Sequence, residues 1–382
     1  MIEELVAQAA AVGERAETLL VGLDDDAAAR RALELLAEAE LLGWTVPAAH
    51  GGADAGDLAG PAAPSVRVLC ALREELAYHS GLLDVMFVMQ GLGSCPIALS
   101  GPSELARAIL PEVARGRQTA AFAVTEPGAG SSLGDVATRA EENGGQWRLN
   151  GHKTLISNAG LAAFYTVLAR TSGQPGDGGR DSLTVFFVPA TARGIEVVRF
   201  EVMAPHPIGD VLLHDVEVPD RNRLGDVGAG LGIVLASLSR FRASVAAAAN
   251  GFARRALDES VARLKSREQF GKPLASFQGL RFELAEMDAR LRASQLLVAE
   301  AAEALDQGRN ATAPVARAKL IATETAAWIC DRAVQHHGGM GVRRGTVVER
   351  LFREVRAPRI YEGTSEIQKL ILAKELLSGG ED

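Results

Sequence analysis

One carboxylate near the C-terminus stands where it could do chemistry. Glu362 lies in the stretch RIYEGTSEIQ (359–368), between an aromatic residue and a glycine, where a helix is about to begin. A helix N-terminus favours negative charge, so one interpretation is a surface acid that the helix dipole stabilises. The other interpretation is a base that removes a proton from a substrate.

Two glycine-rich stretches are candidates for holding a ligand. In AFAVTEPGAGSSLGD (121–135), hydroxyls and backbone N–H groups are available, and glycines let a cofactor approach the backbone closely. Its glycine spacing is neither that of a Walker loop nor that of a GxGxxG turn, and an ordinary β-turn loop is the alternative. The second stretch, QHHGGMG (335–341), carries adjacent histidines that lack a metal-ligand spacing, so we expect no metal there.

A third polar stretch, SREQFGKPLASFQ (266–278), joins two long helical patterns. Arg267 is suited to a phosphate, and Gln269 and Gln278 are suited to the polar edges of a nucleotide. The alternative is a helix–helix connector whose polar residues simply face water. The stretch by itself does not separate these interpretations.

Three segments must position these residues. Residues 1–117 carry apolar residues at the three- and four-residue spacing of helices. Residues 118–222 carry short runs of β-branched and aromatic residues between glycine-rich turns, which predicts a β-sandwich or β-barrel domain. Residues 223–382 return to long helical patterns and predict an antiparallel bundle. We therefore expect a multidomain α+β protein.

Composition narrows the class of protein. The 382 residues are 47% hydrophobic and 23% charged, as in a globular protein of two or three domains. The net charge of -8 and the lack of a long basic block argue against nucleic acid as a partner. Cys70, Cys95 and Cys330 are far apart, so we expect buried free thiols. We expect no membrane-spanning run and a cytoplasmic location.

Five motifs, in order, resemble those of the acyl-CoA dehydrogenase family of flavoproteins. They are TEPGAGS (125–131), KTLISN (153–158), REQFGKP with a later FQ (267–278), QHHGGMG (335–341) and YEGTSEIQ (361–368). The resemblance runs through essentially the whole chain. It implies the fold of that family, which is an N-terminal helical domain, a central β domain and a C-terminal four-helix bundle.

The resemblance also implies FAD, held between the β domain and the bundle and partly by a neighbouring subunit. The positions that match flavin-facing residues are Phe122, Val124, Thr125, Gly130, Ser131, Leu155, Ile156 and Ser157. The positions that match the binding site for the adenosine diphosphate half are Arg267, Gln269, Phe270, Gln278, Gln335, Gly338 and Gly339. Thr364 and Glu366 should touch the cofactor from the last helix. A lone subunit would lack a complete site, so we expect a dimer or a tetramer.

With a flavin present, Glu362 gains a function. The resemblance implies α,β-dehydrogenation of an acyl thioester to the trans-2-enoyl product, in which Glu362 takes the α-proton and the flavin takes the β-hydride. Some family members carry their base directly before an arginine. Here that position is Phe241, ahead of Arg242, and phenylalanine cannot take a proton. The expected substrate contacts are Ser131, Phe241, Arg242, Tyr361 and Gly363.

Several positions depart from the family pattern. Ser132 replaces a usual aspartate, Leu155 a usual tryptophan and Phe122 a common tyrosine, and residues 203–213 lack the usual Gly-x-Arg stretch. These departures indicate an unusual acyl group, carried by coenzyme A or by an acyl carrier protein. We expect an electron-transferring flavoprotein as the partner that accepts electrons. The alternative is a flavin-dependent oxidase or monooxygenase that uses O2.

Overall fold

The computed structural model describes residues 1–177 and 179–378, and the chain divides into two compact units. The first unit contains Met1–Glu17, Val66–Asp84 and the chain from Arg242 onward, and the second contains Thr18–Ser65 and Val85–Phe241. Each unit has its own buried apolar clusters. The three-domain division with boundaries after residues 117 and 222 stays a prediction.

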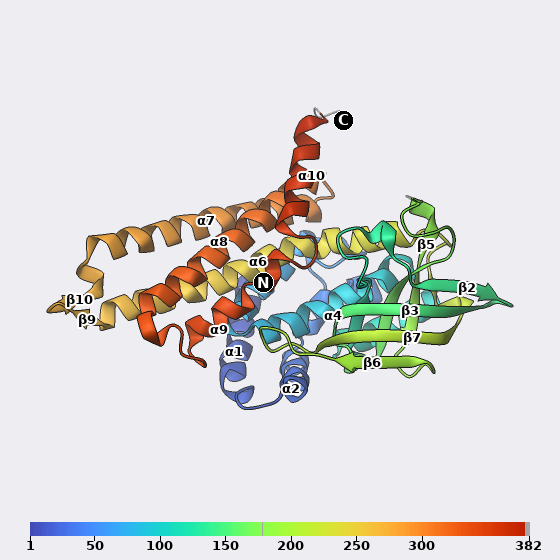
Figure 1. Cartoon of the computed structure of the whole chain (residues 1–382), viewed down its shortest axis with the longest axis horizontal. Coiled ribbons are helices and arrows are strands. Elements are labelled where there is room, and N and C mark those ends of the chain that lie inside the picture. Colours follow the sequence, from blue (N-terminus) through green and yellow to red (C-terminus); the bar gives the residue numbers. More distant parts are fainter. Residues whose placement is uncertain (178, 379–382) are drawn as a thin grey trace. The chain divides into compact units, whose positions relative to one another are not determined.

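Long helices build the first unit, and Figure 1 shows α6, α7 and α8 running side by side. The helices that contribute to this unit are α1 (Ile2–Leu19), α3 (Val66–His79), α6 (Gly230–Ser266), α7 (Gln278–Asp306), α8 (Thr312–His337), α9 (Val347–Glu354) and α10 (Ser365–Leu377). Alanines line their contacts, among them Ala246 and Ala249 of α6 and Ala322 of α8. Small side chains let the helix axes approach closely, so the alanine-rich patterns explain the bundle.

A small hairpin joins α6 to α7. Strands β9 (Glu268–Gln269) and β10 (Lys272–Pro273) pair antiparallel across a two-residue loop. Phe270 and Gly271 of that loop have φ values of 53° and 77°. Two successive positive φ values are typical of the tight turns that connect two-residue hairpins. The connector is therefore a defined structure that presents Phe270 at its tip.

The second unit is built on one eight-stranded mixed sheet in the order β6-β7-β3-β2-β4-β5-β8, with β1 also paired to β4. Its strands are β1 (Ala120–Ala123), β2 (Arg139–Asn143), β3 (Gln146–Ser157), β4 (Phe164–Arg170), β5 (Leu183–Pro189), β6 (Ile195–Arg199), β7 (Ile208–Pro219) and β8 (Arg223–Leu224). Its helices include α2 (Asp25–Glu38), α5 (Ser103–Ala114) and α4 (Gly81–Ser100) from Val85 onward. β1 and β2 pair with β4 in parallel, and the other pairings are antiparallel.

An irregularity near the end of β3 matters for the site. The pairing of β3 with β7 shifts register between Lys153 and Ile156, and Leu155 there has a φ of 56°. Bulges of this kind turn a side chain away from the regular alternation of a strand. Leu155 is accordingly 55% exposed, while its neighbour Ile156 is buried in the core.

The predicted fold class is confirmed, because helical regions lie before and after a β region in the chain. The prediction of buried free thiols is also confirmed for the three cysteines.

The expectation of no apolar run long enough for a membrane does not hold on length and composition alone. Within the described residues, α4 and α6 pass that test, although 83% and 56% of their apolar windows are buried inside the protein. Core helices of globular proteins pass the same test, so this is weak evidence for a membrane span.

Candidate active site

Glu362 lies in a sharp turn between a 3-10 turn (Ala357–Arg359) and α10, in the first unit. Glu362 and Gly363 have φ values of 53° and 92°, so two successive residues adopt the left-handed conformation. A side chain with a Cβ is disfavoured there, and such a residue persists only where its surroundings fix it. The turn therefore needs strong partners.

Three side chains from three helices hold this turn by its carbonyl oxygens. Arg242 of α6 donates from Nε to the Glu362 carbonyl at 2.7 Å. Lys319 of α8 and Gln368 of α10 both donate to the Gly363 carbonyl, at 2.6 and 2.9 Å. The backbone carbonyls of Glu362 and Gly363 are thus fixed, which limits the directions in which the carboxylate can point.

Both ends of the turn are also anchored to α8. Glu324 accepts from Arg359 Nε at 3.0 Å and from Ser365 Oγ at 2.6 Å. Thr364 caps α10 by accepting from the Ile367 N–H at 3.3 Å. Predicted cofactor residues Thr364 and Glu366 therefore lie at the start of α10, where Glu366 is exposed.

Among the described residues, no ion-pair partner faces the carboxylate of Glu362. Its Oε2 atom is buried and has no hydrogen-bond partner in the described structure. Burial raises the pKa of Glu362, and the positive charges of Arg73, Arg242 and Lys319 oppose that rise. A buried acid with a raised pKa and a free oxygen has the properties of a general base.

A buried ion pair that the sequence analysis did not identify lies near this acid. Arg73 of α3 binds Asp84 through both carboxylate oxygens, at 2.7 and 2.8 Å, and donates to Ser244 Oγ at 2.9 Å. Arg73 and Asp84 are 1% and 2% exposed. Asp84 raises the pKa of Arg73 even though burial opposes this, so the guanidinium stays charged. Burial raises the pKa of Tyr361, which keeps its phenol neutral.

The sequence analysis also did not identify Lys319 as a residue of this site. It is fully buried, and burial lowers its pKa to about 8 although Glu362 favours its charged form. The only sequence signal was a single lysine inside the alanine-rich stretch VARAKLIATETAA (315–327). A helix with that pattern has room for a lysine on a solvated face, so burial could not be predicted.

In the second unit, the structure brings the first glycine-rich loop against β3. Lys153 Nζ donates to Glu126 Oε1 at 2.6 Å and to the Val124 carbonyl at 3.1 Å. The Thr154 N–H donates to the Thr125 carbonyl at 2.9 Å. The TEPGAGS and KTLISN motifs are therefore joined by a buried ion pair and a backbone bond, which gives Glu126 and Lys153 a positioning role.

The predicted flavin-facing residues of this unit divide by exposure. Val124 and Ile156 are buried in the core, so only their backbone is available to a ligand. Phe122, Thr125 and Ser157 are partly buried, and the exposed positions are Gly130, Ser131 and Leu155. A Cβ added to Gly130 would meet nothing within 4 Å. Open space beside hydroxyls and an exposed apolar side chain fits the edge of a flavin.

The predicted binding residues for adenosine diphosphate all lie in the first unit and are exposed: Arg267, Gln269, Phe270, Gln278, Gln335, Gly338 and Gly339. Phe270 is 92% exposed. Gly338 has φ 59° and ψ −139°, a conformation that only glycine adopts readily, and neither it nor Gly339 has an atom within 4 Å of an added Cβ. A cation, amides and an open glycine turn fit a pyrophosphate and its nucleoside.

The two histidines of QHHGGMG have partners inside the protein. His336 hydrogen-bonds to Glu283, and His337 hydrogen-bonds to the Ala333 carbonyl.

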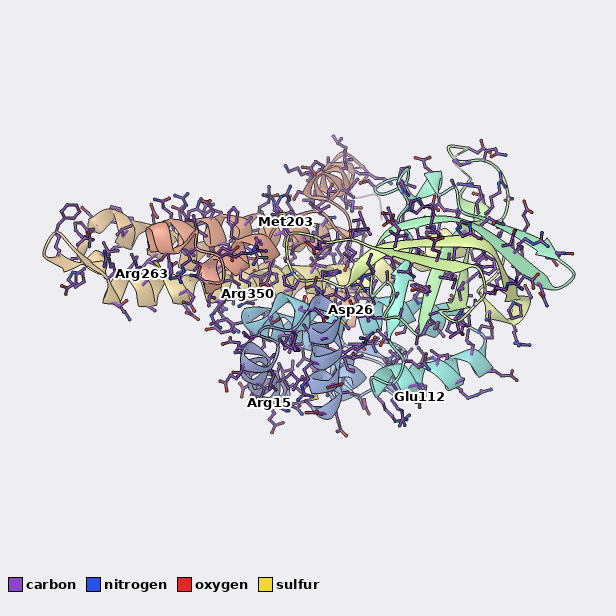
Figure 2. All side chains as sticks on the ribbon, turned by 60° about the horizontal axis from the view of Figure 1, so that its bottom comes forward. Arg15, Asp26, Glu112, Met203, Arg263 and Arg350 are labelled. Atoms are coloured by element: carbon purple, nitrogen blue, oxygen red, sulfur yellow. The ribbon has the colours of Figure 1, made fainter. Side chains whose placement is uncertain are left out.

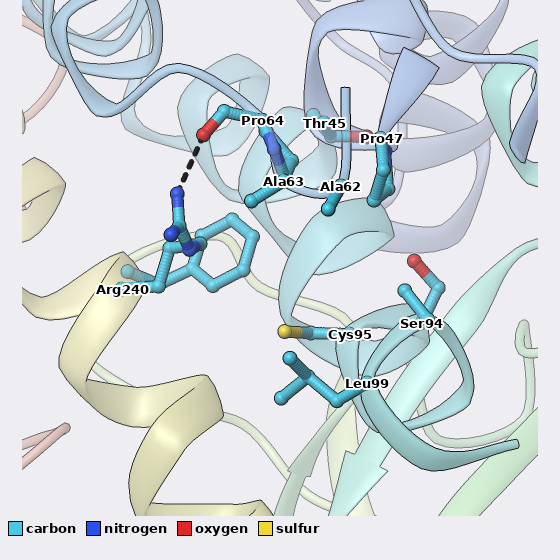
Figure 3. A pocket seen from close by; sticks show the side chains of 11 residues that line it. Thr45, Pro47, Ala62, Ala63, Pro64, Ser94, Cys95, Leu99 and Arg240 are labelled. Atoms are coloured by element: carbon cyan, nitrogen blue, oxygen red, sulfur yellow. Dashed lines mark hydrogen bonds between the residues drawn. The ribbon is translucent and has the colours of Figure 1, made fainter. Parts of the chain in front are cut away.

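Phe241, a predicted substrate contact, lines a small hollow within the second unit (Figure 3). The other residues around the hollow are Thr45, Pro47, Ala62, Ala63, Pro64, Ser94, Cys95, Ala98, Leu99 and Arg240. Arg240 closes one side by donating to the Pro64 carbonyl at 2.8 Å. The hollow has room for about one water molecule. Phe241 directly precedes Arg242, which holds the Glu362 carbonyl.

Fold and motifs together define a flavoprotein oxidoreductase, and comparison with known proteins specifies the family. Models of the N-terminal, middle and C-terminal domains of acyl-CoA dehydrogenases match residues 3–117, 121–216 and 228–377. The chain therefore belongs to the acyl-CoA dehydrogenase family, whose members are FAD-dependent oxidoreductases that act on CH–CH bonds.

Individual relatives extend over nearly the whole chain. The chain is 37% identical over 346 residues to a 3-(aryl)acrylate reductase of Clostridium sporogenes, covering 90% of this chain and 89% of that protein. It is 35% identical over 353 residues to subunit CarC of the caffeyl-CoA reductase–Etf complex of Acetobacterium woodii, with coverage of 90% and 89%. Its structure is similar to that of butyryl-CoA dehydrogenase from Megasphaera elsdenii, with a TM-score of 0.90, 30% identity and 98% of both chains covered.

Proposed function

We propose that this protein catalyses α,β-dehydrogenation of an acyl thioester with FAD, and that Glu362 is the base. The observation that carries the proposal is the Glu362 carboxylate. Its buried Oε2 has no hydrogen-bond partner within the part of the chain that the structure describes, while Arg242, Lys319 and Gln368 hold the adjoining backbone. A structural carboxylate in such a place would be expected to bind one of these donors itself.

The residues present fit FAD. In the proposal, the TEPGAGS loop and the Leu155–Ser157 stretch of one copy hold the flavin, and Arg267, Gln335 and the Gly338–Gly339 turn of a neighbouring copy hold the diphosphate. When bound, FAD accepts the hydride that leaves the β-carbon of the substrate. A dimer or a tetramer follows from this arrangement.

Glu362 removes the proton from the α-carbon. The thioester carbonyl acidifies that carbon, and the raised pKa of Glu362 brings the base closer to the acidity of its substrate. The positive charges of Arg73, Arg242 and Lys319 oppose the rise in the pKa of Glu362 that burial causes, and so favour its ionised form. The thioester oxygen would accept a hydrogen bond from the backbone N–H of Glu362. The direction of this N–H is set by the turn, whose carbonyls are held by the three donors described above.

The same residues serve the reverse reaction. A protonated Glu362 can return its proton to the α-carbon of an enoyl thioester, because a catalytic group works in both directions. Two relatives are named as reductases, and one belongs to a complex with Etf. We therefore include an electron-transferring flavoprotein as the proposed electron partner, and a cytoplasmic location goes with it. The thioester carrier is coenzyme A or an acyl carrier protein.

A second candidate is an oxidase on the same fold. Leu155 is 55% exposed and occupies a position where the family resemblance predicts a tryptophan. A smaller side chain beside the flavin would leave O2 an easier path to it. Hydrogen peroxide production without any other acceptor distinguishes this candidate.

The test is anaerobic bleaching of the flavin. The purified protein should be yellow and should bleach with a suitable acyl thioester from a panel of alkyl, cyclic and aryl groups on coenzyme A and carrier-protein arms. Glu362→Gln should keep the flavin absorbance and lose bleaching by about 10²- to 10⁴-fold. Glu300→Gln is the control, because Glu300 is an exposed acid of α7 that the proposal does not use, and this variant should bleach like the unaltered protein.

The outcomes separate the parts of the proposal. Undiminished bleaching by Glu362→Gln would rule out Glu362 as the base. A colourless protein that cannot be reconstituted with FAD would rule out the cofactor. Rapid peroxide formation in air would favour the oxidase.

A further inference from the structure

The loop between β6 and β7 carries a histidine that the proposed function does not use. His206 lies within residues 203–213, the stretch that departs from the family pattern, and Met203 of the same loop is labelled in Figure 2. His206 stands between Pro205 and Pro207. Prolines on both sides restrict the backbone of the segment to extended conformations.

This segment is bound to the end of β3. A hydrogen bond joins His206 Nε2 and Ser157 Oγ, which are 2.8 Å apart. The residues that follow these two, Pro207 and Asn158, are joined by a backbone hydrogen bond from the Asn158 N–H to the Pro207 carbonyl at 2.6 Å. The backbone N–H of His206 donates to Asp25 Oδ2 at 3.3 Å. The backbone is therefore held at His206 and at the next residue, while the imidazole itself binds Ser157.

The imidazole is neutral at physiological pH. Burial and, to a smaller extent, the nearby positive charge of Arg199 together lower the pKa of His206 to about 4. Arg199 is itself fixed by the Ala159 carbonyl at 2.9 Å and by Asp26 (Figure 2) at 2.6 Å. A neutral imidazole has one nitrogen that donates and one that accepts.

A neutral, fixed imidazole limits what Ser157 can offer a ligand. If Nε2 accepts, the single hydroxyl proton of Ser157 is used on His206, and Oγ presents only lone pairs elsewhere. If Nε2–H donates, the hydroxyl proton is free to be donated to the ligand. Without His206 the hydroxyl would rotate and take either role.

We propose that His206 is a positioning residue that fixes the hydrogen-bonding role of Ser157 Oγ toward the flavin and thereby sets the equilibrium between oxidised and reduced flavin. The inference rests on the proposed function, in which Ser157 lines the flavin. The oxidised and reduced rings differ in where they donate and accept, so a hydroxyl fixed in one role favours one of them. A net hydrogen bond of about 0.5–1.5 kcal/mol changes that equilibrium by roughly two- to tenfold.

The experiment measures the ratio of oxidised to reduced flavin against a reference dye, without substrate, on the FAD-loaded protein. His206→Leu removes the hydrogen bond at similar volume, and His206→Gln keeps an amide near the place of Nε2. We expect His206→Leu to shift the ratio two- to tenfold and His206→Gln to restore much of it. His214→Leu is the control, because His214 lies on β7 with a side chain 62% exposed.

A double-mutant cycle shows whether His206 acts through Ser157. Ser157→Ala should shift the ratio by itself, and adding His206→Leu to it should then have no further effect. Thermal unfolding and FAD affinity, measured on the same variants, separate a loss of folding or binding from a change in the flavin.

Failure of the inference and failure of the proposed function give different results. If Ser157→Ala shifts the ratio but His206→Leu does not, the inference is wrong and the flavin placement stands. Equal, additive shifts from the two variants would also overturn it. If the protein binds no FAD, or if Ser157→Ala leaves the ratio unchanged, the placement of the flavin is wrong and the inference falls with it.

Discussion

At Glu362, three cations act on a carboxylate without binding it. Arg242 and Lys319 donate to backbone carbonyls, and Arg73 is bound by Asp84. Their charges oppose the rise in the pKa of Glu362 through space, and none forms an ion pair with its carboxylate in the described part of the chain. The acid therefore experiences positive charge while its lone pairs remain free for a proton.

Lys319 gives this arrangement a pH signature. The activity should fall at low pH as Glu362 protonates and should fall again above about pH 8, where Lys319 loses its charge. In Lys319→Met we expect the acidic limb to move to higher pH, because one opposing cation is gone, and the alkaline limb to disappear. The rate of flavin reduction should fall by roughly tenfold, the effect of about 1.4 kcal/mol on the barrier, since the turn loses a donor. Stopped-flow reduction across pH measures both limbs.

The contribution of Lys319 to the stability of the folded chain changes with pH in the opposite direction to activity above about pH 8. The pKa of Lys319 is about 8 in the folded chain and 10.5 ordinarily, so between these values the unfolded chain holds more protons. The contribution of Lys319 therefore makes the folded state more stable as pH rises through this window. Lys374→Met, an exposed lysine of α10, is the control and should change neither profile. An unmoved acidic limb in Lys319→Met would show that this charge does not act on Glu362.

The sequence identified the acid but not its surroundings. Glu362, Tyr361 and Gly363 stand in a motif of consecutive residues, which can be recognised without a structure. Arg73, Asp84 and Lys319 come from three other helices, and ordinary patterns place charged residues of such helices on the solvated face. Their burial depends on which helices meet, and that information is not local.

At the scale of elements, periodicity predicted the long helices and most strands. The runs of β-branched and aromatic residues cover β1, β3, β4, β5 and β6 but not β7 (Ile208–Pro219), which pairs with β3 along its length and with β6 over Gly209–Leu213. Its sequence, IGDVLLHDVEVP, interrupts strict alternation with the pair His214–Asp215, both exposed. Asp215 has a φ of 49°, so the strand is irregular there and its sequence lacks the continuous apolar/polar alternation that predicts a strand.

The packing of α4 against α6 in the second unit makes a test at this scale. A Cβ added at Gly91 of α4 would lie 2.6 Å from the Phe241 ring, which is 1% exposed. Alanine favours a helix by about 1 kcal/mol over glycine, so any loss of stability must come from the clash. We expect Gly91→Ala to lower the Tm by roughly 2–6 °C, as overpacking by 1–3 kcal/mol would do.

Compensation at Phe241 tests the cause. Leucine lacks the far edge of the ring, so Gly91→Ala with Phe241→Leu should recover part of the lost Tm, although Phe241→Leu alone is destabilising. Thermal unfolding of the four proteins gives the coupling. Simple additivity of the two losses would mean that the helices move apart as a whole and that Phe241 does not depend on Gly91 for its position.

At the scale of the whole molecule, the predicted cofactor residues are divided between the two compact units. Gly130 and Ser157 belong to the second unit, and Arg267 and Gly339 belong to the first. The proposal that a neighbouring copy completes each FAD site turns this division into a prediction about mixtures of variants. Gly130→Asp and Gly339→Asp suit the test, because neither position has an atom within 4 Å of an added Cβ and neither has a positive φ.

Each variant alone should fold and lose FAD, since a carboxylate would occupy the space that the flavin or the diphosphate needs and would repel the latter. In a mixed pair, one site combines the intact loop of one copy with the intact glycine turn of the other. The second site carries both defects. Random reassembly of equal amounts should therefore restore FAD to about a quarter of all sites, because about half of the pairs are mixed and each has one intact site.

The measurement is flavin absorbance after the two variants are unfolded, mixed and refolded together, compared with the same variants refolded apart and then combined. If each subunit held its FAD with its own residues alone, every site would carry one defect, and co-refolding would restore nothing. Mixing without refolding should also restore nothing unless subunits exchange. Recovery near a quarter therefore depends on sites shared between copies, which neither variant alone can report.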